Sequence, residues 1–241
     1  MCIRDSIGIF RQKQRGMNYV GLKVLVGRVK AADLRSIAAL AVRYGNGEVR
    51  LSPAQAFVIP HISDRLVGEL AEEPLVKQFA YNPSALYKGL VSCVGSDYCN
   101  LAVIETKSRA VETARVLERK LGDTLKPITL HWSGCPAGCG NHPVADIGLL
   151  GKKAKVGGKV VDAVDVFVGG RSGPDPKLAT KIMEDVPCDR LPAVLEMIMP
   201  YHTREKMHRV RGKAVPKGTG ASKSTASGNE TTGLTPQPLP A

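Results

Sequence analysis

The chain has 241 residues, of which 43% are hydrophobic and 23% are charged. This length and composition suit one large or two modest globular domains, and no apolar run is long enough to predict a membrane span. The first residues also lack the apolar segment of a secretory signal peptide, so we expect a cytoplasmic protein whose cysteines stay reduced.

The net charge of +12 invites a nucleic-acid-binding interpretation, but the distribution of charge argues against it. Residues 1–30 carry a net charge of +6 and residues 200–241 carry +5, which leaves the middle of the chain nearly neutral. The basic ends are either solvated termini or a basic rim that attracts an acidic partner protein.

The amino-terminal part of the chain predicts a compact α+β unit. Its first six residues, MCIRDS, resemble a translated sequencing adaptor, so we expect residues 1–6 to be an artefact, Cys2 included, and the reading frame to begin inside a longer gene. Periodicity and capping residues then predict a strand at 18–29, a helix at 33–44 capped by Asp33, strands at 48–51 and 55–60, and a helix at 63–70 capped by Ser63.

The remainder of the chain predicts a second unit with buried strands. We expect strands at 127–132, 145–150 and 164–168, a short apolar run at 90–94, a basic turn at 152–159, and helices at 106–121, 178–185 and 191–202. Residues 212–241 are rich in Gly, Ser, Thr and Pro and have little apolar content, which predicts a disordered tail.

Four of the six cysteines form two close pairs. Cys93 and Cys99 stand in SCVGSDYCN, Cys135 and Cys139 stand in SGCPAGCGN, and 35 residues lie between the pairs. Both pairs fall in predicted loops at the ends of apolar runs. The glycines of the second pair allow the backbone to bend tightly around a bulky inorganic group.

Three interpretations of these cysteines compete. Structural zinc usually takes C-x2-C spacings, which neither pair has, and disulfides are disfavoured where no secretory signal is present. An iron–sulfur cluster needs four thiolates supplied from loops, and the two pairs provide them. Spacing alone favours the cluster and leaves zinc and unrelated thiols open.

Two longer strings carry a resemblance to a known family. GLVSCVGSDYCNLAVIETK and LHWSGCPAGCGNHPVADIGLLG are similar to the paired signature of the sirohaem nitrite/sulfite reductase family, and the similarity extends from about Gln12 to about Pro192. The resemblance implies an α+β fold. A ferredoxin-like half-domain at residues 7–80 would be followed by a mixed α/β domain at residues 81–211 that binds sirohaem and a [4Fe–4S] cluster.

The family's ligand set can be carried over to this chain residue by residue. The resemblance implies that Cys93, Cys99, Cys135 and Cys139 hold the [4Fe–4S] cluster, and that Cys139 also bridges to the sirohaem iron as its axial ligand. Asn141, which stands where the family commonly has Gln, is expected to contact the cofactor. The pair Ala137–Gly138 also departs from the family's common Asn-Ser, but neither departure affects the ligands.

Within the family, ETK after the first pair and HW before the second resemble the ferredoxin-dependent nitrite reductases. The implied activity is the six-electron reduction of nitrite to ammonia by a monomer that takes electrons from ferredoxin and binds neither nucleic acid nor membrane. Sulfite reduction within the same family is the alternative, and a non-redox zinc-binding module is the rival from another class. The family draws its substrate-binding basic residues mostly from an N-terminal half, so the catalytic residues stay unknown and we expect this chain alone to be inactive.

Three other residues admit two interpretations each. Arg171 in VGGRSG could pair with a sirohaem carboxylate or be an ordinary turn arginine. His131 could face the cofactor, although a packed or surface histidine is the simpler interpretation. Cys188, between Pro187 and Asp189, is expected to be a plain thiol.

Overall fold

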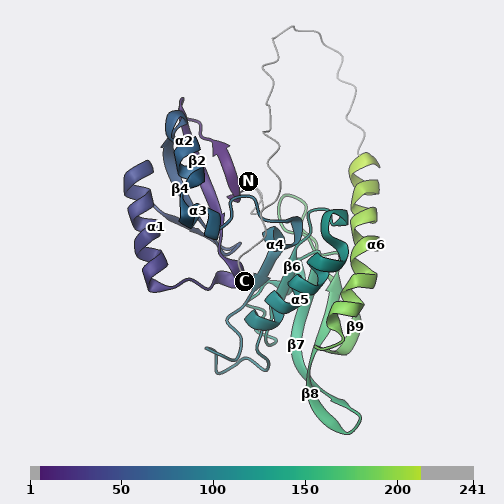
Figure 1. Cartoon of the computed structure of the whole chain (residues 1–241). Helices are drawn as coiled ribbons and strands as arrows, with labels where there is room; N and C mark the ends of the chain where they lie inside the picture. The colour runs from purple at the N-terminus through teal and green to yellow at the C-terminus, as the bar shows by residue number, and fades with distance from the viewer. Residues whose placement is uncertain (1–5, 213–241) are drawn as a thin grey trace.

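The structure is a computed structural model that describes residues 6–212 (Figure 1). The predicted adaptor segment, apart from Ser6, and the predicted disordered tail beyond Gly212 lie outside these residues. The described residues form two α+β units, each a single sheet with helices against it. No helix between residues 6 and 212 has the length and apolar character that a bilayer crossing requires.

The first unit is a four-stranded antiparallel sheet in the order β1-β2-β4-β3 with three helices. Its elements are β1 (Gly8–Arg11), β2 (Met17–Lys23), α1 (Ala31–Tyr44), β3 (Arg50–Ser52), β4 (Ala56–Ser63), α2 (Val67–Glu72) and α3 (Pro74–Gln78). Helix α1 buries Ile37, Leu40, Ala41 and Tyr44, which recur at helical spacing, against the β2–β4 side chains Val20, Leu22, Phe57 and Ile59. These residues form the core of the first unit.

Three predicted boundaries in this unit are wrong. The strand at 18–29 ends at Lys23, because Val26 has a left-handed φ of 47° and the chain turns into a short 3-10 helix, Leu25–Gly27. Helix α1 begins at Ala31, and Asp33 accepts a hydrogen bond from the Lys30 N–H at 3.4 Å from inside the first turn. Ser63 caps no α-helix, since the 3-10 turn Asp64–Leu66 precedes α2.

The second unit is a mixed five-stranded sheet in the order β5-β6-β7-β8-β9. Its elements are α4 (Ala85–Gly89), β5 (Leu90–Ser92), α5 (Lys107–Leu121), β6 (Leu130–Ser133), β7 (Ile147–Val156), β8 (Lys159–Val168), β9 (Thr180–Pro187) and α6 (Leu191–Gly212). The pairs β5–β6 and β6–β7 are parallel, whereas β7–β8 and β8–β9 are antiparallel. Helices α5 and α6 lie side by side over this sheet (Figure 1), and Leu117, Leu195 and Trp132 belong to the shared core.

Two predictions for the second unit are also wrong. The segment 178–185 is not a helix, because residues from Thr180 onward pair with β8, with Val164 opposite Val186. The basic segment 152–159 is not a turn, since most of it continues β7. The hairpin turns at Gly157 and Gly158, which have left-handed φ values of 56° and 81°. The remaining predicted elements are present, but three are longer than predicted: β7 continues to Val156, β8 begins at Lys159, and α6 continues to Gly212 instead of ending at residue 202.

Candidate functional site

The two cysteine pairs begin at the carboxyl ends of neighbouring parallel strands. Strand β5 ends at Ser92, directly before Cys93, and β6 ends at Ser133, two residues before Cys135. The register pairs Ser92 with Trp132. Because the carboxyl ends of parallel strands meet at one edge of a sheet, both cysteine loops start from the same edge.

Hydrogen bonds join the two loops to each other. The Gly134 N–H donates to the Cys93 Sγ at 3.2 Å, and the Val103 N–H donates to the Gly134 carbonyl at 2.8 Å. A Cβ atom on Gly134 would lie 3.2 Å from the Ile104 carbonyl oxygen, so the loops also pack closely. The second cysteine loop therefore packs directly against the first.

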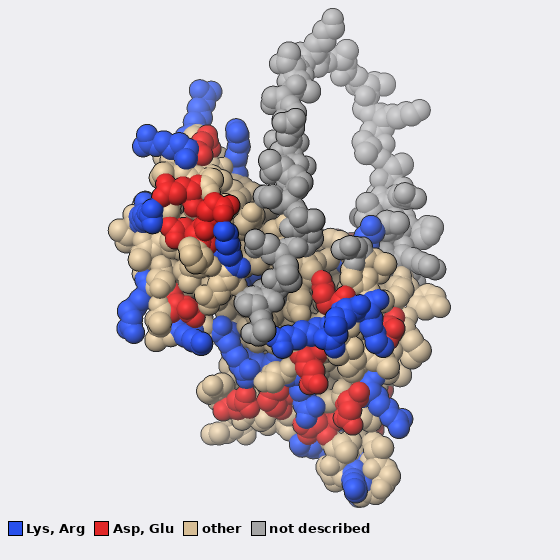
Figure 2. Space-filling view, viewed as in Figure 1, with Lys and Arg blue, Asp and Glu red and all other residues tan. Residues whose placement is uncertain are grey.

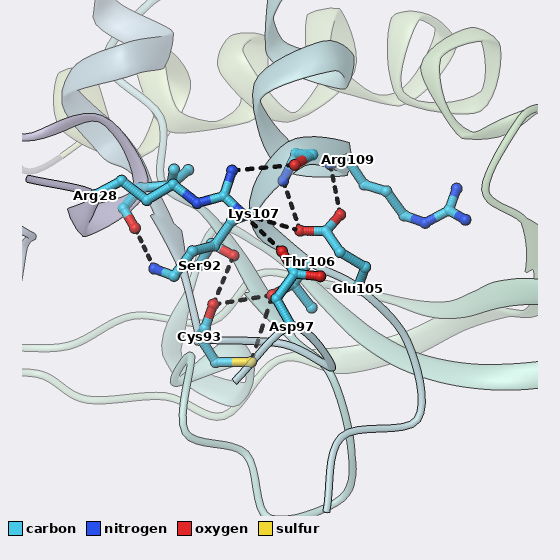
Figure 3. Close-up of polar contacts among 10 residues, drawn as sticks. Arg28, Ser92, Cys93, Asp97, Glu105, Thr106, Lys107 and Arg109 are labelled. Atoms are coloured by element: carbon cyan, nitrogen blue, oxygen red, sulfur yellow. Dashed lines mark hydrogen bonds and ion pairs between the residues drawn. The ribbon is translucent and has the colours of Figure 1, made fainter. Parts of the chain in front are cut away.

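Cys93 is held on several sides (Figure 3). Its N–H donates to the Trp132 carbonyl at 3.0 Å, and the Thr106 hydroxyl donates to its carbonyl at 2.9 Å while lying 3.7 Å from its sulfur. Thr106 directly precedes helix α5. The residue before this helix therefore holds the first cysteine in addition to the bond from β6.

The connection between β2 and α1 of the first unit reaches the same region. Arg28 lies 2.8 Å from Asp97 and 3.7 Å from Glu105, both in the loop between Cys93 and α5 (Figure 3). The Lys107 amine donates to the carbonyl of Val26. Burial, followed by the nearby Arg28 charge, lowers the pKa of Lys107. Both units therefore contribute to the surroundings of the first cysteine loop.

Glycines and left-handed residues shape the second loop. The Gly138 N–H donates to the Cys135 carbonyl at 3.1 Å, and the Asn141 N–H donates to the Gly138 carbonyl at 2.8 Å. Gly138 and Asn141 have φ values of 70° and 55°. A Cβ atom on Gly140 would lie 2.0 Å from the Trp132 carbonyl oxygen, so only glycine fits beside Cys139.

All five described cysteines are free thiols. Cys139 is exposed and Cys93, Cys99 and Cys135 are partly buried, whereas Cys188 lies in the core of the second unit, where burial raises its pKa to about 11. Among the side chains that the structure describes, no three of His, Cys, Asp or Glu lie close enough together to hold a single metal ion. Ligation by all four paired cysteines therefore stays a prediction.

The donor set nevertheless fits an iron–sulfur cluster. Unpaired thiols arise from two glycine-containing loops at one sheet edge, and a backbone N–H already points at one of the sulfurs. A cubane takes one thiolate at each of its irons, so it needs its ligands spread around a larger volume than a zinc ion does. Loops that are joined by their backbones and still partly open to solvent meet that need.

Asn141, Arg171 and His131 line one small cavity between the two units. Its volume is about 90 Å³, and its wall includes Ala54 from the first unit and Asp146 from the second. This volume is far below that of a typical cofactor pocket, roughly 300–1,000 Å³. The guanidinium of Arg171 pairs with Asp175 at 2.6 Å, an arrangement typical of an ordinary turn arginine. Contact of Asn141 or Arg171 with a cofactor stays a prediction.

His131 is a neutral side chain in this cavity. Burial lowers its pKa to about 4. Its Nδ1 lies 3.2 Å from the Asn141 carbonyl oxygen, which can only accept, so Nδ1 carries the proton. The histidine thus links β6 to the residue that follows Cys139 by two positions and holds no charge at neutral pH.

Sequence reasoning missed two residues that connect the units beside Cys93. Lys23 is wholly buried and its amine donates to Ala54 and Leu90 carbonyls, while the Gln55 side chain bonds Ser92. Lys23 stands inside the apolar run VGLKVLV, and a lysine in a buried strand is a signal that could have identified it. The sequence around Gln55 carries no such signal.

Comparisons with known proteins agree with this geometry. The nitrite/sulfite reductase ferredoxin-like half domain matches residues 10–76, and the nitrite and sulphite reductase 4Fe-4S domain matches residues 88–226. The chain is 47% identical to the ferredoxin–nitrite reductase of Synechococcus elongatus over 196 residues, which are 81% of this chain and 38% of that protein. It is also 47% identical to the chloroplastic ferredoxin–nitrite reductase of Oryza sativa subsp. japonica, over 81% of this chain and 33% of that protein.

A solved structure is similar to most of this chain. The structure of the Mycobacterium tuberculosis NirA protein superposes with a TM-score of 0.72 at 33% identity, over 79% of this chain and 36% of that chain. The chain thus spans about a third of the length of the curated relatives that it matches. With its ferredoxin-like half-domain, its 4Fe-4S domain and its two paired-cysteine loops, the chain belongs to the nitrite and sulphite reductase family.

Proposed function

We propose that the whole protein reduces nitrite to ammonia with electrons from ferredoxin, at a sirohaem that shares a cysteine with a [4Fe–4S] cluster. The observation that carries the proposal is the common origin of both cysteine loops at the carboxyl edge of β5 and β6, joined by the Gly134 N–H to Cys93 Sγ bond. The relatives named ferredoxin–nitrite reductase support the choice of substrate and donor.

In this proposal the four paired cysteines, Cys93, Cys99, Cys135 and Cys139, would hold the cluster, and Cys139 would also be a ligand for the sirohaem. Cys139 is the exposed member of the set, which suits a ligand that must also meet a second group. The cofactors supply single-electron transfer and bind the anion, whereas the protein supplies orientation and electrostatics. Gly134 and Thr106 hold Cys93, and Gly140 keeps the Cys139 loop against β6.

Reduction of nitrite also consumes protons and needs basic groups that polarise the anion. We assign no described residue to this role, because Arg171 is paired with Asp175 and Lys23 is wholly buried. The substrate-binding cations stay unassigned in this proposal. We also propose that the whole protein is a monomer in a compartment that keeps thiols reduced, such as the cytoplasm.

A groove lined by arginines supports the proposal that the electron donor is an acidic protein. Lys and Arg side chains form a band over α5 in Figure 2, while acidic side chains gather over α2. The groove has a volume of about 430 Å³ and is lined by Arg28, Arg115 and Arg119, with Glu112 as its acidic member. Because Arg28 also contacts the first cysteine loop, a donor seated here would lie near the proposed cluster.

The experiment compares nitrite and sulfite as substrates of the whole protein with reduced ferredoxin as donor. Ammonia formed from nitrite and sulfide formed from sulfite are measured over a range of concentrations, and kcat/KM is compared. We expect the higher kcat/KM for nitrite. A higher value for sulfite would assign the protein to the alternative activity of the same family, and no turnover of either anion would reject a reductase function.

A further inference from the structure

Strand β5 is an edge strand whose outer side is satisfied by side chains of the other unit. In a strand, successive residues turn their N–H and C=O groups to opposite sides. The Cys93 N–H points toward β6 and bonds the Trp132 carbonyl. Leu90 and Ser92 therefore present their backbone groups to the outer edge, where no sixth strand of the described residues continues the sheet.

Gln55 takes the place of that missing strand. Its Nε2 donates to the Ser92 carbonyl at 2.5 Å and its Oε1 accepts from the Ser92 N–H at 3.2 Å. A primary amide can bond both the N–H and the C=O of one residue, as the backbone of a neighbouring strand would. Beside it, the Lys23 amine donates to the Leu90 carbonyl at 2.7 Å.

Gln55 is held in a strained conformation to make these bonds. Its φ is 55°, in the left-handed region that a residue with a long side chain rarely adopts. Its N–H donates to the Ser52 carbonyl at 3.0 Å, and its carbonyl accepts from the Val24 N–H at 2.9 Å. A Cβ atom on Gly27 would lie 3.2 Å from the Gln55 Nε2, so the glycine leaves room for the amide. Hydrogen bonds thus fix the backbone of Gln55 at one end and its terminal amide at the other.

We propose that Gln55 is a positioning residue for Cys93, acting through Ser92. The proposal rests on the proposed role of Cys93 as a cluster ligand. The half-domain then does more than pack against the cluster domain, because its β3–β4 turn sets the backbone from which the first thiolate projects. Without the amide, the last residue before Cys93 loses both outer hydrogen bonds, and the ligand gains freedom to move.

The first test needs no cluster. Amide hydrogen exchange is followed at Ser92 in the 241-residue chain and in Gln55→Met, which keeps the side-chain length but cannot form the two bonds. We expect exchange at Ser92 to rise about tenfold. Gln55→Asn should behave alike, because Asn tolerates the left-handed region yet is too short to reach Ser92. Unchanged exchange at Ser92 in both variants would overturn the proposal.

The matched control is Asn18→Ala. Asn18 is a buried amide of the same half-domain, and its side chain donates to Asp64 at 2.6 Å and to the Ile62 carbonyl, without reaching β5. This variant weakens the half-domain and leaves the Ser92 bonds in place. We therefore expect Ser92 exchange in this variant to match the wild type, once the change in its free energy of global unfolding is taken into account.

The second test uses the chain after anaerobic loading with iron and sulfide. In Gln55→Met we expect about tenfold faster release of iron to a chelator, with an altered electron paramagnetic resonance signal of the reduced cluster. Asn18→Ala should change neither. Equal release from both variants would overturn the positioning role in favour of general destabilisation. If the wild-type chain took up no cluster and Ser92 exchange changed as expected, the cluster assignment would be rejected. The hydrogen bonds from Gln55 to Ser92 would still be supported.

Discussion

At the scale of single residues, Lys23 lies in β2 with its side chain wholly out of water. Its amine donates to the Ala54 carbonyl at 2.5 Å and to the Leu90 carbonyl at 2.7 Å. Burial lowers its pKa to about 7, so above that pH the amine is neutral and its two N–H groups meet two acceptors. An unfolded chain would return the amine to its ordinary pKa near 10.4.

This difference makes stability depend on pH with a definite sign. Between about pH 7 and pH 10 the unfolded state binds a proton that the folded state lacks, so the free energy of unfolding should rise with pH by up to about 1.4 kcal/mol per unit. Below pH 7 both states carry the charge and this contribution is flat.

Urea denaturation of the chain at pH 7, 8 and 9 measures the effect. Lys23→Met should remove this rise, whereas Lys77→Met, at an exposed lysine of the same half-domain, should keep it. The difference in slope between the two variants is the quantity to compare. The same slope in both variants would contradict the buried, neutral amine.

Cys188 provides a second prediction at this scale. Its thiol is buried in the core, and burial raises its pKa to about 11, so almost none is thiolate at pH 8. In the cluster-free chain, iodoacetamide should therefore modify the loop cysteines well before Cys188, as mass spectrometry of peptides would record. Modification of Cys188 at the same rate as the exposed Cys139 would contradict its placement in the core.

At the scale of elements, Gly140 decides how closely the second cysteine loop approaches β6. In Gly140→Ala, the new Cβ would lie 2.0 Å from the Trp132 carbonyl oxygen, so the loop must move. We expect a loss of about 2–4 kcal/mol in the free energy of unfolding, together with loss of bound iron after cluster loading.

Gly68 is the matched control, since it lies in α2 and a Cβ atom placed on it would meet no other atom within 4 Å among the described residues. Gly68→Ala should stabilise the chain by about 0.5–1 kcal/mol because alanine favours the helix. Urea denaturation measures both variants. If the two substitutions had similar effects, the close approach at Gly140 would not matter.

Elements with their own periodicity could be predicted from the sequence. Helices α1 and α5 place apolar residues such as Ile37 and Leu117 at helical spacing, and the cysteine spacing pointed to paired loops. The edge strand β9 could not be predicted, because its pairing with β8 is tertiary and most of its side chains are exposed. The bonds from Lys23 and Gln55 to β5 were missed for a similar reason, since they join residues 37 or more positions apart.

At the scale of the whole molecule, charge should govern the encounter with an acidic donor. Exposed charges attract over about 10 Å at 0.1 M salt and less at higher ionic strength. Ferredoxin affinity of the whole protein should therefore fall as salt rises. Arg115→Glu, in the groove over α5, should weaken binding and flatten the salt dependence, whereas Arg35→Glu on α1 should do neither. Calorimetric titration at several salt concentrations tests this, and a flat response in the wild-type protein would contradict it.

The central claim is that the two cysteine loops hold one [4Fe–4S] cluster, and its most direct measurement is the metal and acid-labile sulfide content of the anaerobically loaded chain. We expect about four irons and four sulfides per chain, lost when Cys93, Cys99, Cys135 or Cys139 is replaced by alanine and kept in Cys188→Ala. One zinc per chain without labile sulfide, or a full cluster in any of the four loop variants, would contradict the account.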